Sequence, residues 1–118
     1  MKISILTILI LVGLFCGTAI GDEFCATEQC EEAQKIPNLP ADVITFVDRR
    51  DGCDHFRGEP WDNGDDPIKK ERREFIIKNL NEFCTGTDKQ LEELREKYRD
   101  DATLSNLLEK YESKIELN

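Results

Sequence analysis

Four of the five cysteines follow an apolar N-terminal segment, and these four constrain the fold more than any other feature. The first 21 of the 118 residues have the form of an export signal: Lys2 gives a positive start, residues 3–15 are almost all apolar, and Ala19-Ile20-Gly21 places small residues at a cleavage site. The apolar run is shorter than the ~20 residues that span a bilayer, and no stop-transfer segment follows. We therefore expect a cleaved signal peptide over residues 1–21 and a mature chain of 97 residues, periplasmic or secreted, where thiols oxidise.

Cysteine use after the signal predicts two disulfides. Cys25, Cys30, Cys53 and Cys84 are an even set in a small exported domain, and three connectivities are possible. We favour Cys25–Cys30, which are close in sequence, and Cys53–Cys84, which close a loop of about thirty residues. Closing that loop stabilises the fold by roughly 3–4 kcal/mol in the chain-entropy model. A zinc site built from all four thiolates is the competing interpretation, but neither C-x-x-C nor a matching pair of histidines occurs.

The mature chain is strongly acidic. The full sequence holds 25 acidic and 16 basic residues, and the signal takes away only the basic Lys2, so 25 acidic against 15 basic residues leave a net charge of −10. Nucleic acids and anionic lipids attract basic proteins, so we expect no nucleic acid as a partner and no membrane after signal cleavage. A lipid anchor on Cys16 would need a small residue where Phe15 stands. Any protein partner is expected to be basic.

Apolar spacing predicts an all-α fold. Residues 22–40 form an acidic N-terminal segment with a short helix over 26–34 and an extended stretch that ends at Pro40. Residues 41–118 form the helical domain, which we expect to be a small domain of three to four helices stapled by disulfides. Four groups of apolar residues at helical spacing define it: Val43, Ile44, Phe46 and Val47; Ile68, Phe75, Ile76, Leu80, Phe83 and Cys84; Leu91, Leu94 and Tyr98; and Leu104, Leu107, Leu108, Tyr111 and Ile115.

Turn and capping residues predict the helix boundaries. Arg49 to Asp66 holds three glycines and a proline, so no regular element is expected to persist through it. Asp66-Pro67 reads as an N-cap followed by proline at the first helical position. Gly86 is expected to end that helix, and Thr87-Asp88-Lys89-Gln90 has the form of a capping box that begins the next.

The segment 53–62 concentrates the residue types that carry chemistry, including the only histidine and the only tryptophan. Aromatic and arginine side chains dominate interface hot spots, so we interpret it as a candidate binding loop of His55, Phe56, Arg57, Glu59 and Trp61. Alternatively, His55 forms an acid–base pair or half of a metal site with Glu59 or Asp54. One histidine without a nucleophile favours a third interpretation, in which His55 bonds a helix end and Trp61 fills a gap beneath the loop.

Two further charged groups have structural interpretations. The aspartates of the turn-rich stretch do not follow the EF-hand pattern, since Arg50 stands at position 3 and Cys53 at position 6 when the motif starts at Asp48. An irregular calcium site remains an alternative to helix capping for Asp62, Asp65 and Asp66. A basic cluster interleaved with glutamates predicts a salt-bridged helix face at Lys69, Lys70, Arg72 and Arg73. We expect no metal, no cofactor and no catalytic residue.

Two resemblances accompany these patterns. The motifs Cys53-Asp54-His55-Phe56-Arg57-Gly58-Glu59, Glu71-Arg72-Arg73 and Cys84-Thr85-Gly86-Thr87-Asp88 resemble those of a group of small exported bacterial proteins. That resemblance covers about residues 40–115 and implies a periplasmic setting and no known activity. Cys84, Leu91, Leu94 and Tyr98 resemble the LprI-type bacterial lysozyme inhibitors, although Leu91-Glu92 stands where their usual Leu-Asp pair is expected.

Together these features predict a non-enzymatic binding or inhibitor protein of the cell envelope, and they leave its oligomeric state open. The alternatives are a structural envelope component and, third, a metal-binding or enzymatic protein centred on His55.

Overall fold

The computed structural model describes residues 25–116, which form five α-helices and no strand. The helices are α1 (Glu28–Gln34), α2 (Ala41–Arg57), α3 (Pro67–Cys84), α4 (Thr87–Lys97) and α5 (Ala102–Glu109). The expected all-α domain is confirmed, with α2 to α5 as its four helices after residue 40. The expected signal peptide and its cleavage site lie outside the described residues. No helix among the described residues is long and apolar enough to cross a membrane.

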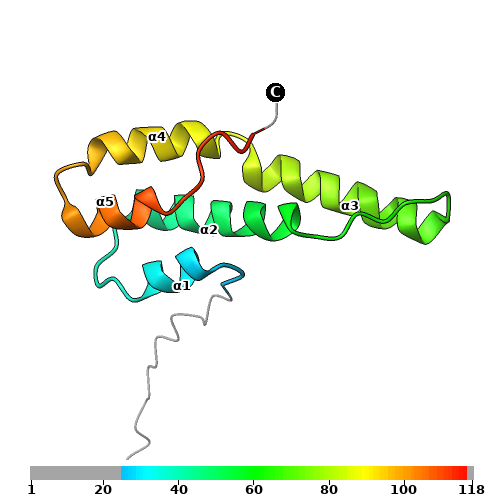
Figure 1. Cartoon of the computed structure of the whole chain (residues 1–118), viewed down its shortest axis with the longest axis horizontal. Helices are drawn as coiled ribbons and strands as arrows, with labels where there is room; N and C mark the ends of the chain where they lie inside the picture. Colours follow the sequence, from blue (N-terminus) through cyan, green and yellow to red (C-terminus); the bar gives the residue numbers. More distant parts are fainter. Residues whose placement is uncertain (1–24, 117–118) are drawn as a thin grey trace, which may run out of the picture.

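Helix α2 lies at the centre of the molecule. It packs against α1, α3 and α4, while α5 packs against α1 and α4. Helix α3 runs back along α2 and extends beyond its end, so that the two form a long hairpin on one side of the molecule (Figure 1). The hydrophobic core lies at the other side, where α1, α2, α4, α5 and the segment after α5 meet.

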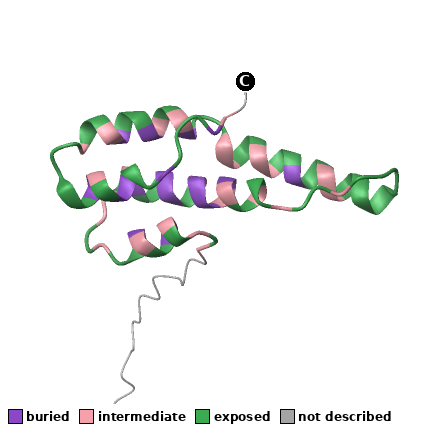
Figure 2. Ribbon diagram, viewed as in Figure 1, coloured by how far each residue is buried: buried purple, intermediate pink, exposed green. Residues whose placement is uncertain are grey.

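Burial differs sharply between α2 and α3 (Figure 2). Six residues of α2 are buried, but Ile76 is the one buried residue of α3. The apolar stripe expected on α3 is therefore only partly a core face: Ile68 is 77% exposed and Phe75 is 58% exposed. The prediction failed here because the start of α3, which holds Ile68, passes the end of α2, and because the ring of Phe75 meets α2 at Phe56 while most of its surface stays exposed.

The prediction that no regular element persists through Arg49 to Asp66 is wrong for its first half. Helix α2 continues to Arg57, and Gly58 is its C-cap. Packing outweighs the helix-breaking tendency of Gly52 because the ring of Phe83 lies where a side chain would stand, 2.9 Å from an ideal Cβ. The connection between α2 and α3 is thus limited to residues 58–66.

Two local features mark the start and the end of α3. The side chain of Asp66 accepts hydrogen bonds from the backbone N–H of Ile68 and Lys69, with proline at the first helical position, as predicted. The helix ends at Cys84, and Gly86, with φ +83°, is the N-cap of α4 rather than the C-cap of α3. The expected capping box is also wrong, since the hydroxyl of Thr87 donates to the carbonyl of Cys84.

The last apolar stripe is interrupted after α5. Asp101 caps the start of this helix through the backbone N–H of Leu104, and the helix ends at Glu109. Tyr111 and Ile115, expected on the same helix, are buried in the irregular segment that follows. Their burial matches the apolar pattern although their secondary structure does not.

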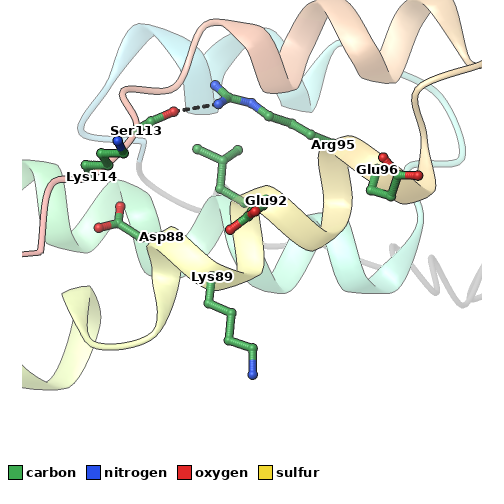
Figure 3. A pocket seen from close by; sticks show the side chains of 8 residues that line it. Asp88, Lys89, Glu92, Arg95, Glu96, Ser113 and Lys114 are labelled. Atoms are coloured by element: carbon green, nitrogen blue, oxygen red, sulfur yellow. Dashed lines mark hydrogen bonds between the residues drawn. The ribbon is translucent and has the colours of Figure 1, made fainter.

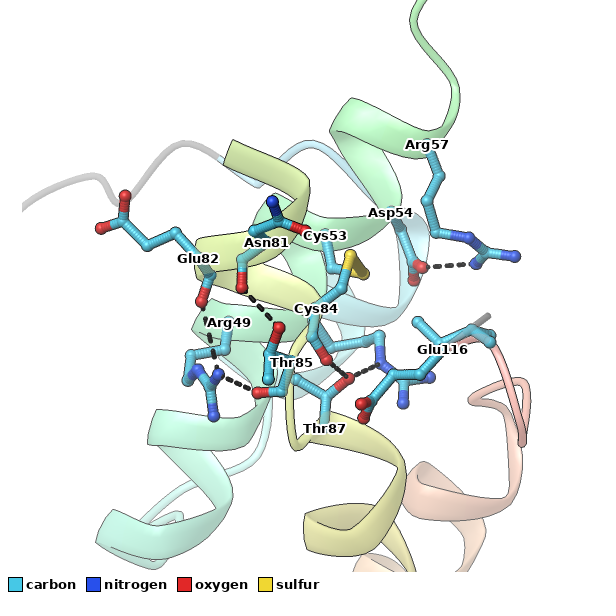
Figure 4. Close-up of a disulfide and its surroundings, with 12 residues drawn as sticks. Arg49, Cys53, Asp54, Arg57, Asn81, Glu82, Cys84, Thr85, Thr87 and Glu116 are labelled. Carbon is cyan, nitrogen blue, oxygen red and sulfur yellow. Dashed lines mark hydrogen bonds and ion pairs between the residues drawn. A yellow bond between two sulfur atoms is a disulfide. The ribbon is translucent and has the colours of Figure 1, made fainter. Parts of the chain in front are cut away.

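The two disulfides have the expected pairing. Cys25–Cys30 ties the N-terminal turn to α1, and Cys53–Cys84 joins the interior of α2 to the last residue of α3 (Figure 4). The alternative zinc site is wrong, because all four thiols are consumed by these bonds.

Candidate functional site

The five residues of the candidate binding loop lie at the turn of the α2–α3 hairpin. His55, Phe56 and Arg57 belong to the last turn of α2, so a helix rather than a loop positions them. Glu59 and Trp61 belong to the connection 58–66. We call this region, residues 54–66 together with Arg72 and Arg73, the hairpin tip.

Two arginines of α3 fix the connection. Arg72 donates to Glu59 Oε2 at 2.7 Å and to Asp62 Oδ2 at 3.2 Å. Arg73 donates to the backbone carbonyls of Asp62 and Gly64 at 2.8 and 2.9 Å. The hydrogen bond from Arg72 holds the pKa of Glu59 below its ordinary value. Half of the basic cluster, Arg72 and Arg73, therefore orders the connection rather than pairing along α3, whereas Lys70 makes an i,i+4 contact with Glu74 at 4.0 Å.

His55 and Glu59 lie close enough to pair. The distance from His55 Nε2 to Glu59 Oε1 is 3.3 Å, one helical turn apart, and both side chains remain accessible to water. Asp54, the other expected partner, instead accepts a hydrogen bond from Arg57 at 2.9 Å, and burial raises its pKa. Glu59 is shared with Arg72, so the pair resembles a surface ion-pair network more than an isolated acid and base.

Phe56 serves the fold rather than the surface. Its ring meets Phe75 edge-on at 5.8 Å and stacks on Phe83 at 6.0 Å. Arg57 is tied to Asp54 on its own helix and to Glu112 at 3.4 Å. Trp61 differs from both, because 51% of it is exposed. The expectation that Trp61 fills a gap beneath the loop is wrong, and this residue is the large aromatic side chain that the tip displays.

The alternative metal sites find no support in the described residues. Asp62 accepts from Arg72, and Asp66 caps α3. Within residues 25–116 no group of three or more His, Cys, Asp or Glu side chains is placed to hold a metal ion.

No pattern in the sequence indicates that Arg50 is the most buried charged residue among residues 25–116. Its side chain is fully buried, and it donates to Thr87 Oγ1 at 3.2 Å, Asp88 Oδ1 at 3.2 Å and the carbonyl of Glu112 at 2.6 Å. Burial lowers its pKa, and the field of Asp54 and Asp88 opposes that shift. Charged residues are almost never buried without partners, so these hydrogen bonds are what allows the Arg50 guanidinium to be buried. They join α2, α4 and the C-terminal segment beside the Cys53–Cys84 disulfide.

A groove of about 650 Å³ lies between α4 and residues 113–114 (Figure 3). Its rim is polar and mixed in charge, with Asp88, Lys89, Glu92 and Lys114 among its residues. Arg95 lines it but is already engaged, since it donates to the carbonyls of Leu108 and Tyr111 and to the hydroxyl of Ser113. The groove pairs no nucleophile with a base, and its arginine holds the C-terminal segment in place.

Comparisons with protein-family models, with curated proteins and with solved structures give no match for this chain.

Proposed function

We propose that this chain is an exported, non-enzymatic binding protein whose hairpin tip contacts a basic protein partner of the cell envelope. One observation carries the proposal: Trp61 is half exposed in a connection that Arg72 and Arg73 hold in one conformation. Tryptophan is the residue type most enriched in binding hot spots. A pre-ordered connection also lowers the entropy lost on association.

The charge around Trp61 supports a basic partner. Residues 58–66 contain four acidic residues and no basic residue. The arginines that order the connection neutralise two of them, Glu59 and Asp62, and leave Asp65 exposed. An apolar side chain with an acidic surround complements a basic surface, and such charges steer association and select partners. Two disulfides support the exported setting, because they persist in oxidising compartments.

Trp61 also supplies the test, because it is the only tryptophan of the chain. Its emission should shift to the blue when the mature protein binds a basic partner that lacks tryptophan. Lysozyme, the first probe for the inhibitor form, contains tryptophan, so its binding is followed by retention on the immobilised mature protein. Trp61→Ala should weaken binding about 30-fold or more, the size of a hot-spot loss. Ile44→Ala is the matched control, since Ile44 is 43% exposed on α2 away from the tip.

The outcomes separate the general proposal from its inhibitor form. If lysozyme is not retained on the immobilised mature protein at physiological salt, the proposal that this protein inhibits lysozyme is contradicted. If Trp61→Ala captures the same proteins from envelope extract with undiminished affinity, the tip is not the binding surface.

A further inference from the structure

The outer flank of α3 carries a stripe of exposed residues, of which Phe75 also meets the edge of the Phe56 ring of α2. Ile68, Glu71, Phe75, Lys78 and Glu82 follow one another at spacings of three and four residues, so they form one line along the helix. All five are exposed, Ile68 by 77% and Phe75 by 58%. We call this line the α3 stripe. It borders the hairpin tip, where Phe56 meets Phe75, but it contains neither Trp61 nor the arginines that order the connection.

The two central charges of the α3 stripe are unpaired within the described chain. Among the other charges of α3, Lys70 pairs with Glu74 and Arg72 with Glu59, while the side chains of Lys69 and Glu82 form no ion pair within residues 25–116. Glu71 and Lys78 make no ion pair or hydrogen bond with any side chain among residues 25–116. They stand on either side of Phe75, four residues before it and three residues after it, and they have opposite signs.

We propose that the α3 stripe is a homodimer interface whose occupant is α3 of a second copy, packed antiparallel. A two-fold axis beside Phe75 brings the two Phe75 rings together and sets Glu71 of each copy against Lys78 of the other. The stripe is thus complementary to itself, which is what an isologous interface requires. A parallel arrangement would instead set Glu71 against Glu71 and Lys78 against Lys78, and like charges in register oppose association.

The apolar and charged residues have separate roles in this dimer. Phe75 and Ile68 remove apolar surface from water, which drives association. The two Glu71–Lys78 pairs add little attraction at an exposed site but select the antiparallel orientation. Because small interfaces form weak complexes, we expect a dimer Kd of about 1–100 μM.

Charge reversal tests the proposal on the mature protein by sedimentation equilibrium from about 1 μM to 1 mM, a range that brackets this affinity. Glu71→Lys and Lys78→Glu alone should each raise the dimer Kd about tenfold or more, because both ion pairs become repulsive. The double variant restores opposite charges and should return the Kd to within about threefold of the parent value. Reversal of the Lys89–Glu93 pair on α4 is the matched control and should leave the Kd unchanged.

Ile68→Asp provides a second measurement. It should abolish the dimer without lowering the thermal midpoint of the monomer, because Ile68 is exposed and outside the core. The proposal is overturned if the parent protein is a monomer at every concentration. It is also overturned if the dimer Kd does not change when the charge of Glu71 or Lys78 is reversed. The proposal is independent of the tip, since Trp61→Ala should dimerise like the parent protein.

Discussion

Single residues in α2 decide how this small protein packs. Gly52 lies in the middle of the helix, where glycine costs ~1 kcal/mol relative to alanine. Its missing side chain lets the ring of Phe83 approach α2, and that ring in turn stacks on Phe56. Arg50, one half-turn earlier, is fully buried and bonds α4 and the C-terminal segment. The two residues place α2 against its neighbours on different sides.

Gly52→Ala should destabilise the protein by about 1–2 kcal/mol in urea denaturation. The new Cβ would lie 2.9 Å from Cγ and Cδ1 of Phe83. Such overpacking destabilises the fold by more than the higher helix propensity of alanine stabilises it. Gly58→Ala is the matched control, since its nearest atoms lie at 3.5 Å and its φ is −84°. That change should be neutral or stabilise by up to ~1 kcal/mol. Equal stability of the two variants would mean that Phe83 moves aside freely.

At the scale of helices, α3 depends on the α2–α3 hairpin more than on the core. It buries one residue, Ile76, and otherwise contacts α2 through Phe83 and through the disulfide of Cys84 with Cys53. Arg49 of α2 adds hydrogen bonds to the carbonyls of Glu82 and Thr85 at the end of α3. A helix with so little buried surface needs such links to stay in place.

The two disulfides should contribute unequally. Replacing Cys53 and Cys84 by alanine should cost about 3–4 kcal/mol, because the bond closes a loop of 31 residues. Replacing Cys25 and Cys30 should cost about 2 kcal/mol, since that separation is 5 residues. Thermal midpoints of both double variants give the order, and hydrogen exchange should show faster opening of α3 in the first. The reverse order would contradict the role given to the hairpin link.

At the scale of the whole molecule, the segment after α5 packs into the core and links the helices through hydrogen bonds. Tyr111 and Ile115 are buried in it, and it supplies acceptors or donors to three helix residues, Arg50, Asp88 and Arg95. Asp88 is central, because it accepts from Arg50 and from the backbone N–H of Ile115 and Glu116. Burial acts to raise the pKa of Asp88, but the backbone and Arg50 hydrogen bonds outweigh it and hold that pKa below the ordinary value.

This contact predicts a pH-dependent effect of Asp88→Asn. A carboxylate with a lowered folded-state pKa stabilises the fold above its ordinary pKa of about 3.9, and the stabilisation disappears as pH falls through the folded value. The variant should therefore lose roughly 2–3 kcal/mol at pH 7, as for hydrogen bonds to a charged group, and approach the parent protein near pH 2. Asp100→Asn, at a fully exposed position, should change the unfolding free energy by less than about 0.5 kcal/mol at either pH. If the difference in unfolding free energy between Asp88→Asn and the parent protein does not decrease in acid, the stabilising role of the Asp88 carboxylate is contradicted.

The sequence alone determined the features that depend on neighbouring residues or on composition. The helical class follows from apolar spacing, and Asp66-Pro67 begins α3 because capping is local. The number of cysteines predicted two disulfides, and the favoured one of the three possible pairings is the one in the structure. Trp61 and His55 were identified by residue type, but their exposure and their partners were not.

The tertiary structure decided everything that depends on which surfaces meet. Helix α2 passes through Gly52 because Phe83 fills the space beside it, and Arg50 is buried because α4 and the C-terminal segment offer acceptors. Neighbouring apolar residues of α3 give a buried Ile76 and a largely exposed Phe75, because the two side chains leave the helix on different faces and only one of these faces packs fully against the rest of the fold. Periodicity records which side chains share a face of a helix, whereas burial depends on a second element reaching that face, and only the folded chain brings that element there.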